Sequence, residues 1–182
     1  PVAEVVHKKK DTEWPKLSDG LDSLLEAYPD VKCLIHCVNY QLASYLYYNS
    51  KHKNRMMTHR TENRSEVLER FKRDPKPRVL MSPSMERGVS LMGDQCRMVG
   101  IVKVPSPDLS DKQVSARLYG YKDGQLWYEY QTVSGLVQSS LRATRSYDDW
   151  SVIHILDSKF AELYQNRWTL FPSYWRDAVI MV

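Results

Sequence analysis

Residues 31–38 read VKCLIHCV, an apolar run that is followed directly by Asn39. A short and nearly continuous apolar run is typical of a strand that is buried on both faces, as in a parallel sheet. Asn39 is of a type that caps helices, and Leu42 and Leu46 follow it at helical spacing. This stretch therefore predicts a buried strand that leads into a helix, which is how a βαβ unit begins.

The same alternation continues on both sides of this stretch. Before it, Leu21, Leu24 and Leu25 predict an amphipathic helix over residues 18–28. After it, the sequence predicts strands at 55–59, 79–81, 97–104 and 152–156, and helices at 63–73, 110–122, 124–144 and around Phe160 and Leu163. Because strands alternate with helices, we expect one α/β domain with a parallel sheet and helices on both faces.

This domain is predicted to span residues 18–165, with a different kind of segment on each side. Residues 1–17 are polar and lysine-rich, and we expect a linker or entry segment there. Residues 166–182 form an aromatic C-terminal tail, which we expect to pack against another domain rather than to stack on bases. The sequence begins at Pro1 and not at Met, so we expect the working protein to contain more chain.

The composition narrows the class of protein. The 182 residues suffice for one ordinary domain, and a net charge of +4 is compatible with a nucleic-acid-binding face without establishing one. No apolar run is long enough to cross a bilayer and no signal peptide is evident, so we expect an intracellular protein without a membrane partner. The three cysteines have no paired spacing, which favours buried thiols over a metal site or a disulfide.

Ligands of open parallel sheets bind at the carboxyl ends of the strands, and three segments carry suitable residues there. The first is Asn39-Tyr40, where a helix begins and its free N–H groups suit a phosphate. An ordinary helix cap explains the same pattern, and spacing alone favours that simpler interpretation.

The second segment is SPSMERG, which follows the strand predicted at 79–81. It places the hydroxyls of Ser82 and Ser84, the carboxylate of Glu86 and the backbone of Gly88 in one short turn. Hydroxyls and backbone amides can hold nucleic-acid phosphates. A serine-stabilised turn without a ligand is the alternative.

The third segment is QSSLRATR. In a continuous helix, Gln138, Arg142 and Arg145 would lie along one face. Two guanidinium groups on one face can neutralise the charge of a phosphoryl group during transfer. A solvated arginine face that pairs with Asp148 and Asp149 is the alternative, and spacing does not decide between the two.

Taken in order, the three segments resemble the C-terminal helicase domain of superfamily 2 DNA helicases of the XPD and DinG group. The resemblance runs from about residue 18 to residue 165. KCLIHCVNYQLASYL resembles motif IV, VLMSPSMERGVSLMGDQCRMVGIVKVPSPDLSD resembles motif V, and WYEYQTVSGLVQSSLRATRSYDDWSVIHILDSKF resembles motif VI with the final strand. It implies a RecA-like parallel sheet with helices on both faces, the second helicase domain of a P-loop NTPase.

The resemblance also implies roles for the matching residues. It places Asn39, Tyr40, Ser82 and Ser84 against the backbone of single-stranded DNA, while Glu86 and Gly88 couple the second segment to the nucleotide cleft. Gln138, Arg142 and Arg145 face ATP on a partner domain, with the two arginines as fingers for the γ-phosphate.

The sequence contains no GxxxxGK[ST] loop, so we do not expect the isolated chain to hydrolyse ATP. The resemblance implies that ATP with Mg²⁺ is bound mainly by an N-terminal helicase domain, in cis or in trans. It places the iron–sulfur cluster of the family in that first domain, and we expect no metal site in this chain.

Two positions depart from the family pattern. Leu141 stands where a glycine usually precedes the first arginine, and Ser90 stands where motif V usually carries aspartate. These departures leave open a non-catalytic nucleic-acid-binding or protein-interaction module derived from a helicase domain. A stand-alone α/β enzyme is a third interpretation, but the sequence offers no recognisable pair of nucleophile and base.

Overall fold

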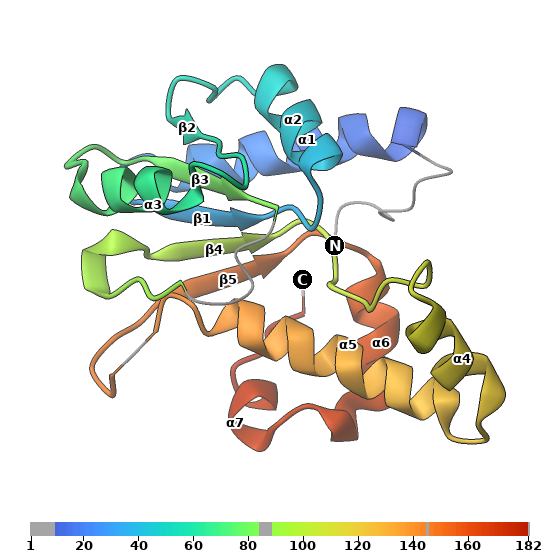
Figure 1. The fold of residues 1–182 in the computed structure, drawn as a ribbon. Coiled ribbons are helices and arrows are strands. Elements are labelled where there is room, and N and C mark those ends of the chain that lie inside the picture. The colour runs from blue at the N-terminus through green and yellow to red at the C-terminus, as the bar shows by residue number, and fades with distance from the viewer. Residues whose placement is uncertain (1–9, 84–88, 145, 182) are drawn as a thin grey trace.

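The computed structural model describes residues 10–83, 89–144 and 146–181, which build a five-stranded parallel sheet between two layers of helices (Figure 1). The strand order is β2-β3-β1-β4-β5, and every neighbouring pair is parallel. The strands are β1 (Cys33–His36), β2 (Met56–Met57), β3 (Val79–Ser82), β4 (Met98–Ile101) and β5 (Val152–Ile155). The predicted α/β fold is confirmed, and each predicted strand is present.

Seven α-helices and two short 3-10 helices accompany these strands in the described part of the chain. They are α1 (Lys10–Ala27), α2 (Tyr40–Asn49), α3 (Arg64–Arg73), η2 (Gly93–Gln95), α4 (Lys112–Gly120), α5 (Gly124–Ser140), α6 (Lys159–Arg167), η3 (Trp168–Leu170) and α7 (Ser173–Arg176). Helices α1 and α2 cover one face of the sheet, while α3, α5, α6 and α7 cover the other (Figure 1). Helix α4 packs against α5 and has no buried residue of its own.

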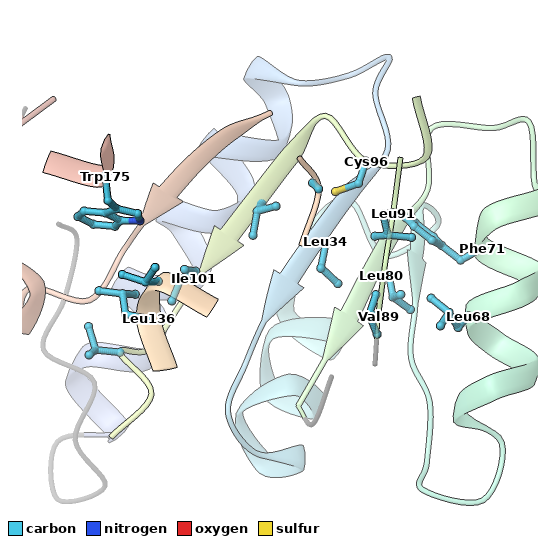
Figure 2. Packing of buried hydrophobic residues seen from close by; sticks show 14 of the residues in the cluster. Leu34, Leu68, Phe71, Leu80, Val89, Leu91, Cys96, Ile101, Leu136 and Trp175 are labelled. Carbon is cyan, nitrogen blue, oxygen red and sulfur yellow. The ribbon is translucent and has the colours of Figure 1, made fainter. Parts of the chain in front are cut away.

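Alternation along the central strand β1 divides the core into two clusters. Cys33 and Ile35 belong to the cluster beneath α1 and α2. Leu34 belongs to the cluster on the other face, which Figure 2 shows extending from Phe71 of α3 to Leu136 of α5 and Trp175 of α7. Because both faces of β1 are covered, its residues are all buried, as the apolar run predicts.

The prediction of a linker over residues 1–17 is wrong for the part that the structure describes. Helix α1 begins at Lys10 and contains Pro15. Trp14 and Leu17 are buried in the same cluster as Leu21 and Leu25, with which they share one helix face. Burial of these two side chains outweighs the backbone hydrogen bond that proline cannot donate.

The aromatic residues of 166–182, which were expected to pack against another domain, pack in part against this one. Phe171 and Trp175 are buried and stack on each other, with ring centroids 4.9 Å apart. Both rings also contact Phe160 and Tyr164 of α6. The C-terminal segment therefore packs into the core of this domain and completes one end of it.

The three cysteines are buried and unpaired, as predicted. Burial raises the pKa of Cys33 and of Cys96 to about 12 and raises that of Cys37 as well, so the thiols stay protonated at neutral pH. None of the described helices is long and apolar enough to cross a membrane.

Candidate functional site

Two of the three predicted segments meet at the carboxyl edge of the sheet, and the end of α5 lies beside them. The backbone N–H of Cys37 donates to the Ser82 carbonyl at 2.9 Å, and that of Val102 donates to the His36 carbonyl at 3.0 Å. The chain segments that leave β1, β3 and β4 are thereby held next to one another. A small cavity lies between these strand ends and α5, and its walls include His36, Ser82 and Ser139.

A strained turn connects β1 to α2. Val38 has a φ of 65°, a left-handed value that β-branched residues rarely adopt. The N–H of Asn39 donates to the Cys37 carbonyl at 2.8 Å across it, which closes a γ-turn. Backbone strain of this kind is concentrated at functional sites, where the surrounding structure holds it in place.

Asn39 is the N-cap of α2, as the simpler interpretation predicts. Its side-chain oxygen accepts a hydrogen bond from the N–H of Leu42 at 2.8 Å. Because the amide oxygen is used in this way, the side-chain NH₂ is the group with which Asn39 can donate to a phosphate.

Tyr40 lies at the first position of α2 and is 41% exposed. Its hydroxyl lies 3.1 Å from Oγ1 of Thr61, and its ring meets that of His59 edge to face. These contacts come from the segment that follows β2. They fix an aromatic ring at the helix N-terminus, where backbone N–H groups also favour anions.

The second segment is described only in part, because Ser84, Glu86 and Gly88 lie outside the described residues. Ser82 is 1% exposed and lines the cavity. Its hydroxyl is therefore buried in this arrangement, and a direct contact of Ser82 with DNA stays a prediction. Its carbonyl holds the end of β1 through Cys37.

The predicted helical face of Gln138, Arg142 and Arg145 is not present. Helix α5 ends at Ser140 with Leu141 as its C-cap, so Arg142 lies in the turn that follows the helix. Gln138 is exposed on the last turn of α5, Arg142 is partly exposed, and Arg145 lies outside the described residues. The turn breaks the helical spacing on which the prediction depended.

Contacts from two sides hold the turn at Arg142. The N–H of Leu91, which follows the second segment, donates to the Arg142 carbonyl at 3.1 Å. His36, at the end of β1, lines the same small cavity as Ser139 and lies close enough to Arg142 for the guanidinium charge to lower its pKa. This turn therefore connects all three segments.

His36 is uncharged at neutral pH. Its side chain is 4% exposed, and burial is the main cause that lowers its pKa from 6.5 to about 4. The positive charge of Arg142 lowers the pKa of His36 further, while the nearby backbone of Ser139 opposes the shift. A neutral imidazole is compatible with a nearby guanidinium, whereas an imidazolium would repel it.

The sequence patterns assign no role to His36 or to the two serines that end α5. Ser139 and Ser140 are each 2% exposed. One sequence feature is compatible with this burial: two small hydroxyl residues stand shortly before Arg142, inside the helix that was predicted to continue to residue 144. Trp175, which donates a hydrogen bond to Ser140, lies 35 residues further along the chain, and no local pattern points to it.

The sequence profile of the family described as "Helicase C-terminal domain" matches residues 22–178. The chain belongs to this helicase C-terminal domain family. The resemblance to the XPD and DinG group is thereby confirmed.

Solved structures show the same fold for this helicase C-terminal domain. One is S. tokodaii Xpd4, with a TM-score of 0.65 and 17% identity, where the match covers 94% of this chain and 35% of that one. Another is an XPD helicase, with a TM-score of 0.65 and 17% identity over 91% of this chain and 32% of that one. The chain thus spans about a third of the length of these proteins.

A third structure is itself a C-terminal domain. It belongs to the DEAD-box protein Dbp5, with a TM-score of 0.56 and 14% identity over 84% of this chain and 78% of that one. The sheet flanked by helices is therefore that of RecA-like helicase domains, as predicted.

The two departures from the family pattern do not disturb this helicase C-terminal domain internally. Leu141 is 38% exposed and Ser90 is exposed as well. Neither side chain crowds a neighbour within the described core, so both departures concern the outer surface. Within the described ranges, no group of three or more His, Cys, Asp or Glu side chains could hold a metal ion.

Proposed function

We propose that this chain is the second motor domain of an ATP-dependent DNA helicase, completed by an N-terminal domain with a Walker-type loop. The observation that carries the proposal is the match to the helicase C-terminal domain family over residues 22–178. The meeting of segments from β1, β3 and α5 at the carboxyl edge supports it, because ligands of such sheets bind there.

In this proposal Arg142 acts on ATP that is bound by the N-terminal domain. The carbonyl of Arg142 accepts a hydrogen bond from the N–H of Leu91, which would hold its turn in place before the two domains close. A guanidinium placed beside the γ-phosphate neutralises charge that develops as the phosphoryl group leaves. Arg145 is proposed as the second finger, and Gln138 is exposed on the helix turn just before them.

Mg²⁺ and the phosphates would be held mainly by the N-terminal domain, with Glu86 and Gly88 proposed to couple the second segment to that cleft. ATP supplies the phosphoryl group, and this chain contributes positive charge. Binding and release of nucleotide would close and open the two domains, and each cycle would move the protein along one DNA strand.

The nucleic-acid contacts are proposed to come from Asn39 and Tyr40, with Ser84 on the neighbouring segment. Asn39 can donate its NH₂ to a phosphate, and the fixed ring of Tyr40 can stack on a base or lie against the sugar. Ser82 would act indirectly, because its carbonyl accepts the hydrogen bond from Cys37 that holds the turn before Asn39. Contacts of this kind do not depend on the base sequence and weaken with salt.

Arg142→Ala tests the ATP half of the proposal. We expect no ATP hydrolysis from the chain alone, and DNA-stimulated hydrolysis when the N-terminal helicase domain is present. In that two-domain protein, Arg142→Ala should lower kcat by about 10³-fold or more. Arg117→Ala is a matched control, because Arg117 pairs with Asp123 on the remote α4–α5 hairpin. Unchanged hydrolysis in Arg142→Ala would contradict the proposal and favour the non-catalytic module.

Tyr40→Ala tests the DNA half. Binding of fluorescent oligothymidine by the chain should weaken by about 5-fold to 100-fold if one base stacks on the ring. Tyr48→Ala is the control on the same helix, since Tyr48 lies near the opposite end of α2 and is 71% exposed. Equal affinities of the two variants would exclude Tyr40 from the binding surface.

A further inference from the structure

The C-terminal segment is tied to the end of helix α5, two residues before Arg142. The indole N–H of Trp175 in α7 donates to Oγ of Ser140 at 2.9 Å, in a contact that is fully buried. The Ser140 hydroxyl in turn donates to the carbonyl of Val137 at 2.8 Å. Ser140 is therefore fixed both to its own helix and to a segment 35 residues further along the chain.

Trp175 is itself held rigidly. It is 9% exposed and stacks on Phe171, with the two ring planes inclined by 27°. Phe160 and Tyr164 of α6 contact it from other directions. An indole fixed on several sides can place its N–H with little conformational freedom, which a flexible polar side chain could not do.

The two buried serines that end α5 face different parts of the fold. Ser139 lines the same small cavity as His36 of the sheet, and Ser140 accepts a hydrogen bond from Trp175 of the C-terminal segment. The helix stops at Ser140, and the carbonyl of Arg142 is already engaged with Leu91. The path of the backbone into the arginine turn is thus determined by these contacts.

We propose that Trp175 is a positioning residue for Arg142, acting through the buried hydroxyl of Ser140. This inference rests on the proposed function for its consequence in ATP hydrolysis. The C-terminal segment, which the sequence marks only as an aromatic tail, then sets where the arginine turn begins. Displacement of a catalytic group by about 1 Å can cost about 100-fold in rate, so a small shift of this turn would matter.

Trp175→Phe tests the inference with Trp14→Phe as its matched control. Both substitutions shrink a buried tryptophan, but Trp14 lies on the opposite face of the sheet, and its indole N–H has no hydrogen-bond partner in the described part of the chain. Amide hydrogen exchange of Leu91 in the chain itself reports on the arginine turn, because this amide donates to the Arg142 carbonyl. We expect exchange at Leu91 to accelerate about 5-fold to 10-fold in Trp175→Phe and to stay unchanged in Trp14→Phe.

Ser140→Ala shows whether the effect passes through the hydroxyl. It should accelerate exchange at Leu91 as Trp175→Phe does, and the double variant should be no faster than either single variant, because both remove one interaction. Equal exchange in Trp175→Phe and Trp14→Phe would overturn the inference, whatever the activity of the protein. Additive effects of Trp175→Phe and Ser140→Ala would overturn it as well.

Hydrolysis with the N-terminal domain separates this inference from the proposed function. Trp175→Phe should lower kcat by about 10-fold to 100-fold with little change in KM for ATP, since only a transition-state contact is displaced. If Arg142→Ala leaves kcat unchanged, the proposed function fails, and the exchange data alone decide whether Trp175 positions the turn. If Arg142→Ala abolishes hydrolysis while Trp175→Phe keeps full kcat, the positioning role is refuted.

Discussion

His36 shows how one buried polar residue can link a strand to the candidate arginine. It stands at the end of β1, two residues before the strained Val38, and it lines a small cavity together with Ser139 in the last turn of α5. Its neutrality follows from burial in the first place and from the charge of Arg142 in the second. The same residue therefore couples the stability of the domain to pH.

Acid should destabilise the protein partly through His36. Its pKa is about 4 in the folded chain and 6.5 when unperturbed, so the unfolded chain binds more protons between these values. The free energy of unfolding then falls as the pH drops from 6.5 toward 4, by at most about 3 kcal/mol from this group. Urea denaturation at pH 7 and pH 4.5 should show a smaller difference for His36→Phe than for the wild type.

Some pH dependence should remain in His36→Phe. Burial also lowers the pKa of His59 and of His154, and these two residues are unchanged in the variant. The loss of stability between pH 7 and pH 4.5 in the wild type, minus the same loss in His36→Phe, gives the contribution of His36. If the variant loses as much stability as the wild type between the two pH values, His36 is not the buried neutral group described above.

Lys32 caps helix α3 from a distance in sequence. Its ammonium group donates to the carbonyls of Phe71 and Lys72 at 2.8 and 2.9 Å, in the last turn of α3. Lys32→Met keeps an unbranched side chain but removes both hydrogen bonds and the ammonium group, which lies 5.4 Å from the centroid of the Phe71 ring. We expect a loss of about 2–3 kcal/mol in the free energy of unfolding, measured in urea. Lys16→Met, at a lysine whose side chain is 61% exposed, should change it by less than about 0.5 kcal/mol.

At the scale of elements, α1 shows that tertiary packing can outweigh a helix-breaking residue. Pro15 marks a helix break in the sequence, yet the helix continues on both sides of it. Asp22 of the same helix accepts hydrogen bonds from the hydroxyl of Ser50 and the N–H of Lys51 beyond α2. Packing and these hydrogen bonds fix α1 to α2, so the first turns of α1 belong to the domain.

Leu17→Ala distinguishes a packed helix from a linker. Leu17 is fully buried in the cluster beneath α1 and α2, so its truncation leaves a cavity. The free energy of unfolding should fall by about 2–5 kcal/mol. Lys16→Ala, one residue earlier on the exposed side of the helix, should have little effect. A stable Leu17→Ala variant would support the linker that the composition suggested.

The end of α5 shows an error in the other direction, because this helix is shorter than the sequence predicts. Helical spacing extends through residues 124–144 in the sequence, but the helix stops at Ser140. The hydrogen bonds from Trp175 to Ser140 and from Leu91 to the Arg142 carbonyl favour an irregular loop here over a continuation of the helix. Such competition between distant contacts and local spacing leaves no mark in the periodicity.

At the scale of the whole molecule, the parallel sheet follows from patterns that the sequence displays openly. Apolar runs such as 31–38 predict strands, and Asn39 predicts the helix start after the first of them; both predictions are confirmed. The order of the strands follows from pairing between distant segments, and the inclusion of Phe171 and Trp175 in the core follows from packing. Neither is visible in a local window, because the partners of these residues lie in other elements.

The C-terminal segment should unfold together with the rest of the domain. Phe171 is 2% exposed and touches Phe160, Tyr164 and Trp175, so Phe171→Ala should lower the free energy of unfolding by about 3–5 kcal/mol. Tyr174→Ala, at a ring that is 58% exposed in the same segment, should lower it far less. In urea, circular dichroism and tryptophan fluorescence should give one common transition for all three proteins, because a single core connects the segment to the sheet. An early fluorescence transition in the wild type, or a Phe171→Ala variant as stable as Tyr174→Ala, would mean that the segment folds apart from the sheet and cannot hold the arginine turn in place.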